Sequence, residues 1–154
     1  MVYLTHDPID YTRLMEKVRH PSAGGVVTFL GTVRDITGVE ITSALEYEAF
    51  GPMAESLLER IAQEAREQWK LFGLEILHRL GFLKVGEISI AVAVSAPHRA
   101  AAFQACQFVV DRVKLEAPIW KKDHSPTGQS NWVHPGLRKS PLEKEQTSKG
   151  PGLT

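Results

Sequence analysis

The segment KLEAPIWKKDH, residues 114–124, holds the side chains with the clearest capacity for chemistry: Lys114 and Lys121 stand on either side of Pro118. Proline removes a helical donor and disfavours helix at the preceding residue, so a helix should end here. Lys114 would then lie in a last helical turn, where the helix dipole favours a cation, and Lys121 on an extended segment. Solvated lysines occur at such places too, so spacing alone leaves catalytic and surface roles open.

Two further basic positions could bind an anion. His98 and Arg99 fall in the predicted first turn of a helix, where free N–H groups and the positive dipole end favour phosphate. Arg34 follows the strand TFLGTV, in which Gly31 permits close approach of a ligand. Solvated charges are the alternative at both positions, and Phe29 in that strand is more typical of a core residue than of a cofactor platform. The residues by themselves indicate a small anionic ligand, with lysine assistance as an option.

Other chemistries find little support. Cys106 is the only cysteine, so it has no internal disulfide partner, and its helical spacing from Phe103, Val109 and Val110 predicts a buried, inert thiol. The six histidines show no metal-ligand spacing, and neither a glycine-rich phosphate loop nor a Ser-His-Asp arrangement is present. We therefore expect no metal and no cofactor.

Composition indicates one globular unit. With 154 residues and 43% apolar content, the chain can bury a core without disulfides, and we expect a single domain over residues 1–134. Residues 135–154 are polar and rich in Gly, Pro, Lys and Ser, which predicts a loose tail. The 18 basic and 18 acidic side chains cancel, which argues against nucleic acid or an anionic membrane as partner. No secretory signal or membrane-spanning run is seen, so a cytoplasmic location is expected.

The elements that must position these residues follow from apolar spacing. Asp7 is expected to cap a short first helix with Pro8 in its first turn, and a second helix should run from Pro52 to near Trp69. A third should start at residues 96–99. Its predicted buried stripe is Phe103, Cys106, Val110 and Val113.

The strand pattern completes the expected fold. Residues 26–33 and 41–50 look like two paired strands, and 74–80 and 87–94 like two more, separated by residues 81–86. The run 87–94 is apolar enough to be central in its sheet. Ile119–His124 and Trp132-Val133 would form a last pair around a turn at residues 125–128. This order predicts an α+β sandwich with a mainly antiparallel sheet packed by helices.

Four sequence blocks carry a family resemblance. They are FLGTVRD at 29–35, LEYEAF followed by MAE within 45–55, SAPHRAAAF at 95–103 and KLEAPIWKKDH at 114–124. In this order and spacing they closely resemble the large catalytic subunit of molybdopterin synthase, the MoaE family. The resemblance covers nearly everything from Phe29 to Trp132. Its last two blocks are specific, whereas LEYEAF alone would be weak.

The resemblance implies a fold, a reaction and partners. Members of this family adopt an α/β hammerhead fold, form a homodimer, and bind a small ubiquitin-like subunit at each end to give a heterotetramer. The small subunit ends in Gly-Gly bearing a thiocarboxylate, which donates sulfur to cyclic pyranopterin monophosphate. Two such transfers make the dithiolene of molybdopterin. The resemblance thus implies a sulfurtransferase of molybdenum cofactor biosynthesis.

The resemblance also assigns residues. Lys114 and Lys121 match the family's active-site lysines. Arg34, His98 and Arg99 match its substrate-phosphate residues, the latter two supplied by the other protomer, and Phe29 is grouped with this substrate-binding set. Lys122 is adjacent to Lys121, but the residue directly after Trp120 is the better match. Two departures are a rather short loop at 34–39 and a tail after Trp132 without a recognisable motif.

Two alternatives to the enzyme stay open at this stage. A non-catalytic regulatory module could use Arg34 and the His98-Arg99 helix start to hold a phosphate metabolite without turnover. A single-strand nucleic-acid binder could use Trp120, Trp132 and the two adjacent lysines, although neutral net charge and few aromatic residues argue against it.

Overall fold

The computed structural model describes residues 1–37 and 39–133. Its first sheet has four strands in the order β1 (Val2–Thr5), β6 (Gly73–Arg79), β8 (Ile88–Ala96) and β2 (Gly25–Thr32). The second has the order β10 (Ser130–Val133), β9 (Ile119–His124), β5 (Ala44–Ala49) and β7 (Gly81–Lys84). The helices in this part of the chain are α1 (Tyr11–Val18), α2 (Gly51–Gln68) and α3 (Arg99–Glu116). Among the described strands only β1 and β6 pair in parallel, which confirms the predicted α+β class with mainly antiparallel sheets.

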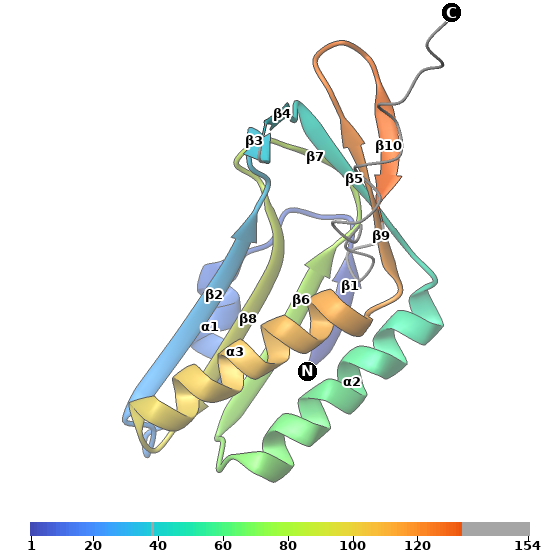
Figure 1. The fold of residues 1–154 in the computed structure, drawn as a ribbon. Coiled ribbons are helices and arrows are strands. Elements are labelled where there is room, and N and C mark those ends of the chain that lie inside the picture. The colour runs from blue at the N-terminus through green and yellow to red at the C-terminus, as the bar shows by residue number, and fades with distance from the viewer. Residues whose placement is uncertain (38, 134–154) are drawn as a thin grey trace, which may run out of the picture.

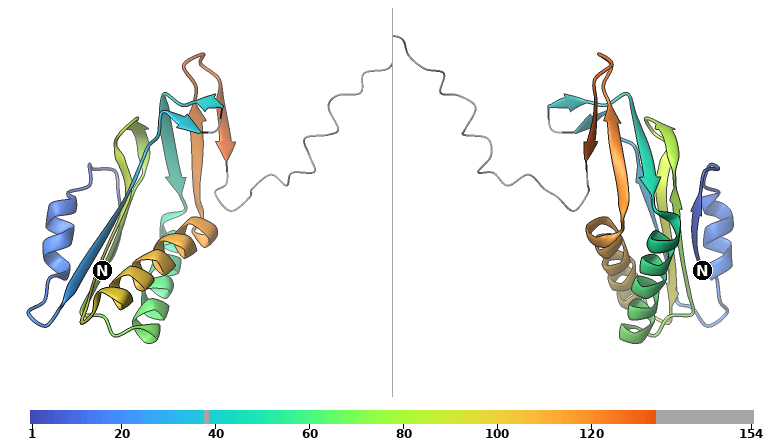
Figure 2. Two further views of the ribbon diagram at one scale, coloured as in Figure 1. Left: turned by 60° about the vertical axis from the view of Figure 1, so that its left-hand side comes forward. Right: turned by 90° about the vertical axis from the view of Figure 1, so that its right-hand side faces the viewer.

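The first sheet is covered on both faces by helices (Figure 2). Helix α1 packs on one face, where Leu14 and Val18 meet the small side chains of Ala91 and Ala93. Helices α2 and α3 pack on the other face, against the branched residues of β6 and β8. Strand β8 therefore buries side chains in both directions, which explains its continuous apolar sequence and confirms its predicted central place.

The second sheet lies at one end of the two long helices, α2 and α3 (Figure 1). Strand β5 leads into α2, and β9 leaves α3 after a break at Ala117 and Pro118. The helix ends at Glu116, and Ala117 is extended with φ −65° and ψ 130°, so the break predicted at Pro118 is confirmed. Strands β9 and β10 pair with each other around residues 125–128, as expected from the sequence.

The predicted pairing of the strands at 26–33 and 41–50 is wrong. Strand β2 pairs with β8, while β5 lies between β9 and β7 in the second sheet. The polar turn between them forms its own hairpin, from β3 (Ile36–Thr37) and β4 (Glu40–Ile41), so the chain passes from one sheet to the other. Residues 81–86, expected as a connection, contain the short strand β7. Partner choice depends on long-range packing that neighbouring sequence does not encode.

Two details of the helices also differ from the prediction. The cap of α1 is Asp10 rather than Asp7, because the Asp10 carboxylate accepts a hydrogen bond from the Arg13 backbone N–H at 3.0 Å. The buried stripe of α3 is centred on Ala102, Cys106, Val109 and Val113, and Phe103, one residue off this line, is 62% exposed. The expected boundary near residue 134 and the polar tail at 135–154 lie outside the described residues. No helix in the described part of the chain is long and apolar enough to cross a membrane.

Candidate functional site

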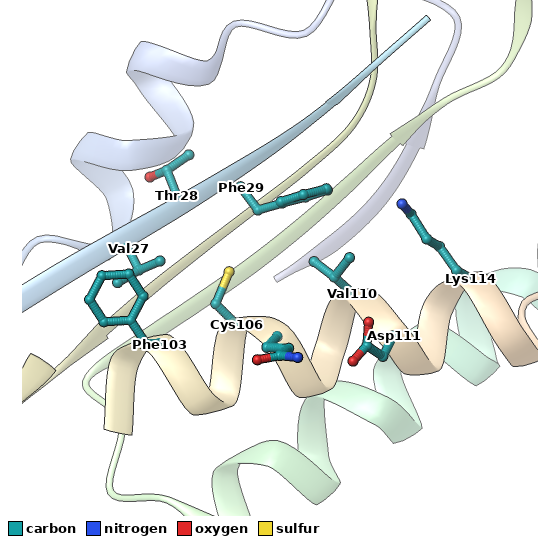
Figure 3. Close-up of a pocket in the computed structure, with 9 residues that line it drawn as sticks. Val27, Thr28, Phe29, Phe103, Cys106, Val110, Asp111 and Lys114 are labelled. Atoms are coloured by element: carbon teal, nitrogen blue, oxygen red, sulfur yellow. The ribbon is translucent and has the colours of Figure 1, made fainter. Parts of the chain in front are cut away.

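A groove of about 470 Å³ runs between strand β2 and helix α3. Val27 and Phe29 line it from the strand, and Cys106, Val110 and Lys114 from the helix. Figure 3 shows Lys114 extending from the end of α3 toward the Phe29 ring. The Lys114 Nζ lies 5.4 Å from the centre of that ring, a cation–π contact. The structure thus brings together two residues that the sequence singled out separately.

Phe29 has two roles in this geometry. Its side chain is partly buried and packs against the main core, as the residue pattern indicated. The same ring forms a wall of the groove and contacts the Lys114 ammonium. Phe29 can therefore pack against the core with one part of its ring and present an aromatic surface to the groove with another.

Lys121 and Lys122 point to opposite faces of the second sheet. In the β5–β9 pairing, Lys121 is opposite Tyr47 and Lys122 is opposite Glu46. The Lys121 ammonium lies 3.6 Å from the Asp123 carboxylate, on the same side of β9. The Lys122 ammonium instead lies 5.5 Å from the centre of the Trp132 ring.

The face that carries Lys121 looks toward the first sheet. Its cross-strand partner Tyr47 contacts the ring of His78 on β6, with ring centres 5.2 Å apart. Ile119, two residues before Lys121, belongs to the core that α2 and α3 cover. Lys121 is therefore partly enclosed on this face, with 26% of its side chain exposed.

His98 and Arg99 lie far from the lysines within one chain. His98 caps α3 without a side-chain cap bond, Arg99 is the first helical residue, and both are exposed. Lys114 lies in the last turn of the same helix, so it is roughly 22 Å from Arg99 along the axis. A single copy of the described chain does not bring the two ends of α3 to one ligand.

Arg34 follows β2 and is exposed at the point where the chain leaves the first sheet for the β3–β4 hairpin. Val33, just before it, is buried and its N–H donates to the Glu87 carbonyl at 3.0 Å, which fixes the strand end. Phe29 therefore lies on β2 and Arg34 lies just after its end. His98 and Arg99 form a separate basic position at the start of α3.

Cys106 is buried beneath the groove. Burial raises the pKa of its thiol to about 11, and a backbone interaction with Phe29 acts in the opposite direction. The thiol is therefore protonated near neutral pH and is a poor nucleophile. This agrees with the inert role predicted from its apolar neighbours. Among the described residues there is no group of three or more His, Cys, Asp or Glu side chains that could hold a metal ion.

Sequence reasoning missed the polar side chains between the sheets. Tyr47 and His78 lie in alternating apolar strands and read as ordinary core positions. Burial lowers the pKa of His78 to about 4, and its Nδ1–H donates to the Arg79 carbonyl at 2.9 Å. Their proximity to Lys121 depends on how two separate sheets face each other. No spacing within one strand could have indicated it.

Known proteins with similar sequences point to one family. A family model described as MoaE protein matches residues 4–116. The molybdopterin synthase catalytic subunit of Bacillus subtilis is 41% identical over 130 residues, covering 84% of this chain and 82% of that protein. The protein of the same name from Thermoplasma volcanium is 39% identical over 132 residues, covering 85% of this chain and 96% of its own length.

Solved structures give the same result. The crystal structure of molybdopterin synthase from Staphylococcus aureus matches with a TM-score of 0.80 and 37% identity, over 84% of this chain and 94% of that chain. A complex of subunits 1 and 2 of molybdopterin-converting factor from Helicobacter pylori matches with a TM-score of 0.71 over 96% of this chain and 99% of that chain. At 19% identity, the second likeness concerns the fold alone.

Proposed function

The chain belongs to the MoaE family, and on that premise we propose that it is the catalytic subunit of molybdopterin synthase, an enzyme of molybdenum cofactor biosynthesis. Its reaction is sulfur transfer from the C-terminal thiocarboxylate of a small ubiquitin-like subunit to cyclic pyranopterin monophosphate. In each transfer a carbon–sulfur bond forms on the pterin substrate in place of a carbon–oxygen bond. The acyl–sulfur bond of the carrier is hydrolysed by water, so the carrier leaves with an ordinary C-terminal carboxylate. Two transfers make the dithiolene.

The Lys114 ammonium facing Phe29 in the groove is the observation that carries this proposal. A thiocarboxylate and a phosphate-bearing substrate are both anionic, and further negative charge develops as the carrier carbonyl is attacked. A positioned ammonium stabilises that charge and can also give or take a proton. The groove walls beside it are mainly apolar, and a bound anion that covered them would interact with the ammonium more strongly than in bulk water.

Lys121 is the second proposed catalytic lysine. It stands on the strand that follows Pro118 and is paired with Asp123 on the face turned toward the first sheet. The Asp123 carboxylate helps to hold the ammonium on that face, where it could stabilise an anionic intermediate. Pro118 thus places one lysine at a helix end and the other on the following strand.

Substrate binding is proposed for Arg34, His98, Arg99 and Phe29. A guanidinium and the free N–H groups at the start of α3 suit a phosphate. Because Arg99 and Lys114 occupy opposite ends of α3, a site with both needs two copies packed with these helices antiparallel. We therefore propose a homodimer in which His98 and Arg99 complete the partner's site.

The small subunit is the proposed protein partner. The Helicobacter pylori structure is a complex of two subunits of a molybdopterin-converting factor, and the present chain shares its fold. A flexible Gly-Gly terminus lacks side chains, so it can enter a narrow space lined by the groove residues. The proposed assembly has one small subunit for each copy of this chain.

The decisive experiment mixes the protein with thiocarboxylated small subunit and cyclic pyranopterin monophosphate, and follows dithiolene formation by mass spectrometry. A small subunit ending in an ordinary carboxylate is the matched control. Product with the first and none with the second is expected. Binding of the cyclic pterin without any product would instead favour a phosphate-binding regulatory module.

A further inference from the structure

The chain crosses between the two sheets at two neighbouring points (Figure 1). After β2, it leaves the first sheet through Val33 and enters the β3–β4 hairpin. After β7, it returns through a tight turn over residues 84–87 and begins β8. The Val33 N–H donates to the Glu87 carbonyl at 3.0 Å, and the Gly86 N–H donates to the Val33 carbonyl at 2.8 Å. The two crossings are therefore hydrogen-bonded to each other.

The Glu87 carboxylate holds this turn from two sides. Its Oε2 accepts a hydrogen bond from the Lys84 backbone N–H at 2.6 Å, and its Oε1 accepts one from the Arg79 guanidinium at 3.1 Å. Arg79 is the last residue of β6, and only 12% of its side chain is exposed. The Lys84 N–H and the Arg79 guanidinium hold the pKa of the Glu87 carboxyl below its ordinary value. The ionised carboxylate therefore joins the turn to the first sheet.

The backbone on both sides of Arg34 is anchored. Val33, just before it, is 2% exposed and packs against leucine side chains of β5 and β7 in a small apolar cluster. Just after it, the Asp35 carbonyl accepts a hydrogen bond from the Thr42 N–H at 2.8 Å. Among the described residues the exposed Arg34 guanidinium has no hydrogen bond or ion pair of its own. The position of this guanidinium therefore depends on how firmly its neighbours are held.

We infer that Glu87 is a positioning residue for Arg34, an inference that rests on the proposed role of Arg34 in substrate binding. The carboxylate fixes the turn, and the turn binds both backbone groups of Val33. Val33 in turn sets where the next residue leaves β2. Without the carboxylate, Arg34 would sample more positions, and the ordering of its side chain on a phosphate would weaken substrate binding.

Glu87→Gln tests this role, because it keeps the size of the side chain but replaces one of the two accepting oxygens by an NH2 group that faces a donor. The half-saturating concentration of cyclic pyranopterin monophosphate should rise about 3-fold or more, while the single-turnover rate constant at saturation changes by less than about 2-fold. The matched control is Glu16→Gln, which breaks the exposed 3.1 Å ion pair with Arg19 and should leave both constants unchanged. An unchanged half-saturating concentration in Glu87→Gln would overturn the inference.

A double-mutant cycle separates positioning from a general structural effect. If Glu87 acts through Arg34, adding Glu87→Gln to Arg34→Ala should cause no further rise in the half-saturating concentration. Rises that multiply would show that the carboxylate acts independently of Arg34, and the inference would fail.

Hydrogen exchange followed by NMR gives a readout that does not depend on activity. The amide protons of Val33 and Gly86 should exchange about 5-fold faster or more in Glu87→Gln, because their bonds join the turn to the end of β2. The Gly24 N–H, which donates to the Ala96 carbonyl at 3.1 Å near the other end of β2, should exchange at the wild-type rate. Unchanged exchange at Val33 and Gly86, or equal acceleration at all three amides, would overturn the inference. If the wild-type protein transferred no sulfur, the proposed function would fail on its own, and the exchange result would still decide whether the Glu87 carboxylate fixes the end of β2.

Discussion

The Lys114 side chain is exposed, but its ammonium contacts an aromatic ring at the wall of a groove. Lys114→Ala should therefore reduce single-turnover sulfur transfer on the order of 10²-fold or more, because a positioned charge is lost where negative charge develops. Folding should be little affected, since the side chain is exposed at the end of α3. Rapid-quench kinetics with saturating small subunit measure the rate. A wild-type rate constant would disprove the lysine mechanism.

Lys121 and Lys122 form a natural pair of test and control. Lys121→Ala should be impaired in the same direction as Lys114→Ala, whereas Lys122→Ala should be nearly silent, because their side chains leave β9 on opposite faces. The same kinetic assay compares them. Equal loss in both variants would mean that the second sheet as a whole, rather than one ammonium, matters for transfer.

His78 predicts an acid sensitivity of the fold. Burial lowers its pKa from 6.5 to about 4, so the unfolded chain binds more protons between these values. Stability should therefore be fully present above about pH 6.5 and fall as the pH decreases toward 4, by about 3 kcal/mol from this group. Urea unfolding across that range should show a flatter pH dependence for His78→Leu. The exposed His6→Leu variant should retain the wild-type slope.

At the scale of elements, the packing of β2 on β8 depends on Gly31. A Cβ there would lie 2.5 Å from the Cγ2 of Ile90, at the point where the register shifts. Gly31→Ala should therefore destabilise the fold by roughly 1–3 kcal/mol through overpacking, as measured by urea unfolding. Gly51→Ala is the control, because a Cβ at that position, at the start of α2, would meet no atom within 4 Å. Similar stability of both variants would contradict this account of the β2–β8 packing.

Local features of the elements could be read from the sequence, and their long-range partners could not. Pro118 ends α3 through its own covalent structure, so that boundary and the placement of Lys114 and Lys121 on different elements were predictable. The strand partners of β2 and β5 follow from how the two sheets are packed, and they were predicted wrongly. The same limit applies to the site. The Phe29–Lys114 contact and the Tyr47–His78 contact join residues from different elements.

At the scale of the whole molecule, helix α3 carries positive charge at both ends, and a single copy of the chain cannot bring these charges to one site. Its basic start, at His98 and Arg99, and its lysine end are separated by the length of the helix. The Phe103 side chain lines the groove and is 62% exposed, so apolar surface lies at the site. An antiparallel second copy would cover that surface and bring Arg99 to the partner's Lys114. One antiparallel dimer would therefore account for both the charge at the two ends of α3 and the exposed apolar surface.

Subunit mixing tests the shared site directly. Arg99→Ala and Lys114→Ala should each be nearly inactive, but a mixed dimer has one site in which the intact Lys114 of one copy meets the intact Arg99 of the other. After random exchange of equal amounts, half of the dimers are mixed, so activity should return to about a quarter of the wild-type level. Exchange is verified by native mass spectrometry of differently tagged copies. The control mixes Arg99→Ala with the Arg99→Ala, Lys114→Ala double variant, which offers no intact site in any combination. If verified exchange restores no activity above that control, each copy must build its site alone, and His98 and Arg99 must serve some other purpose than completing the partner's pocket.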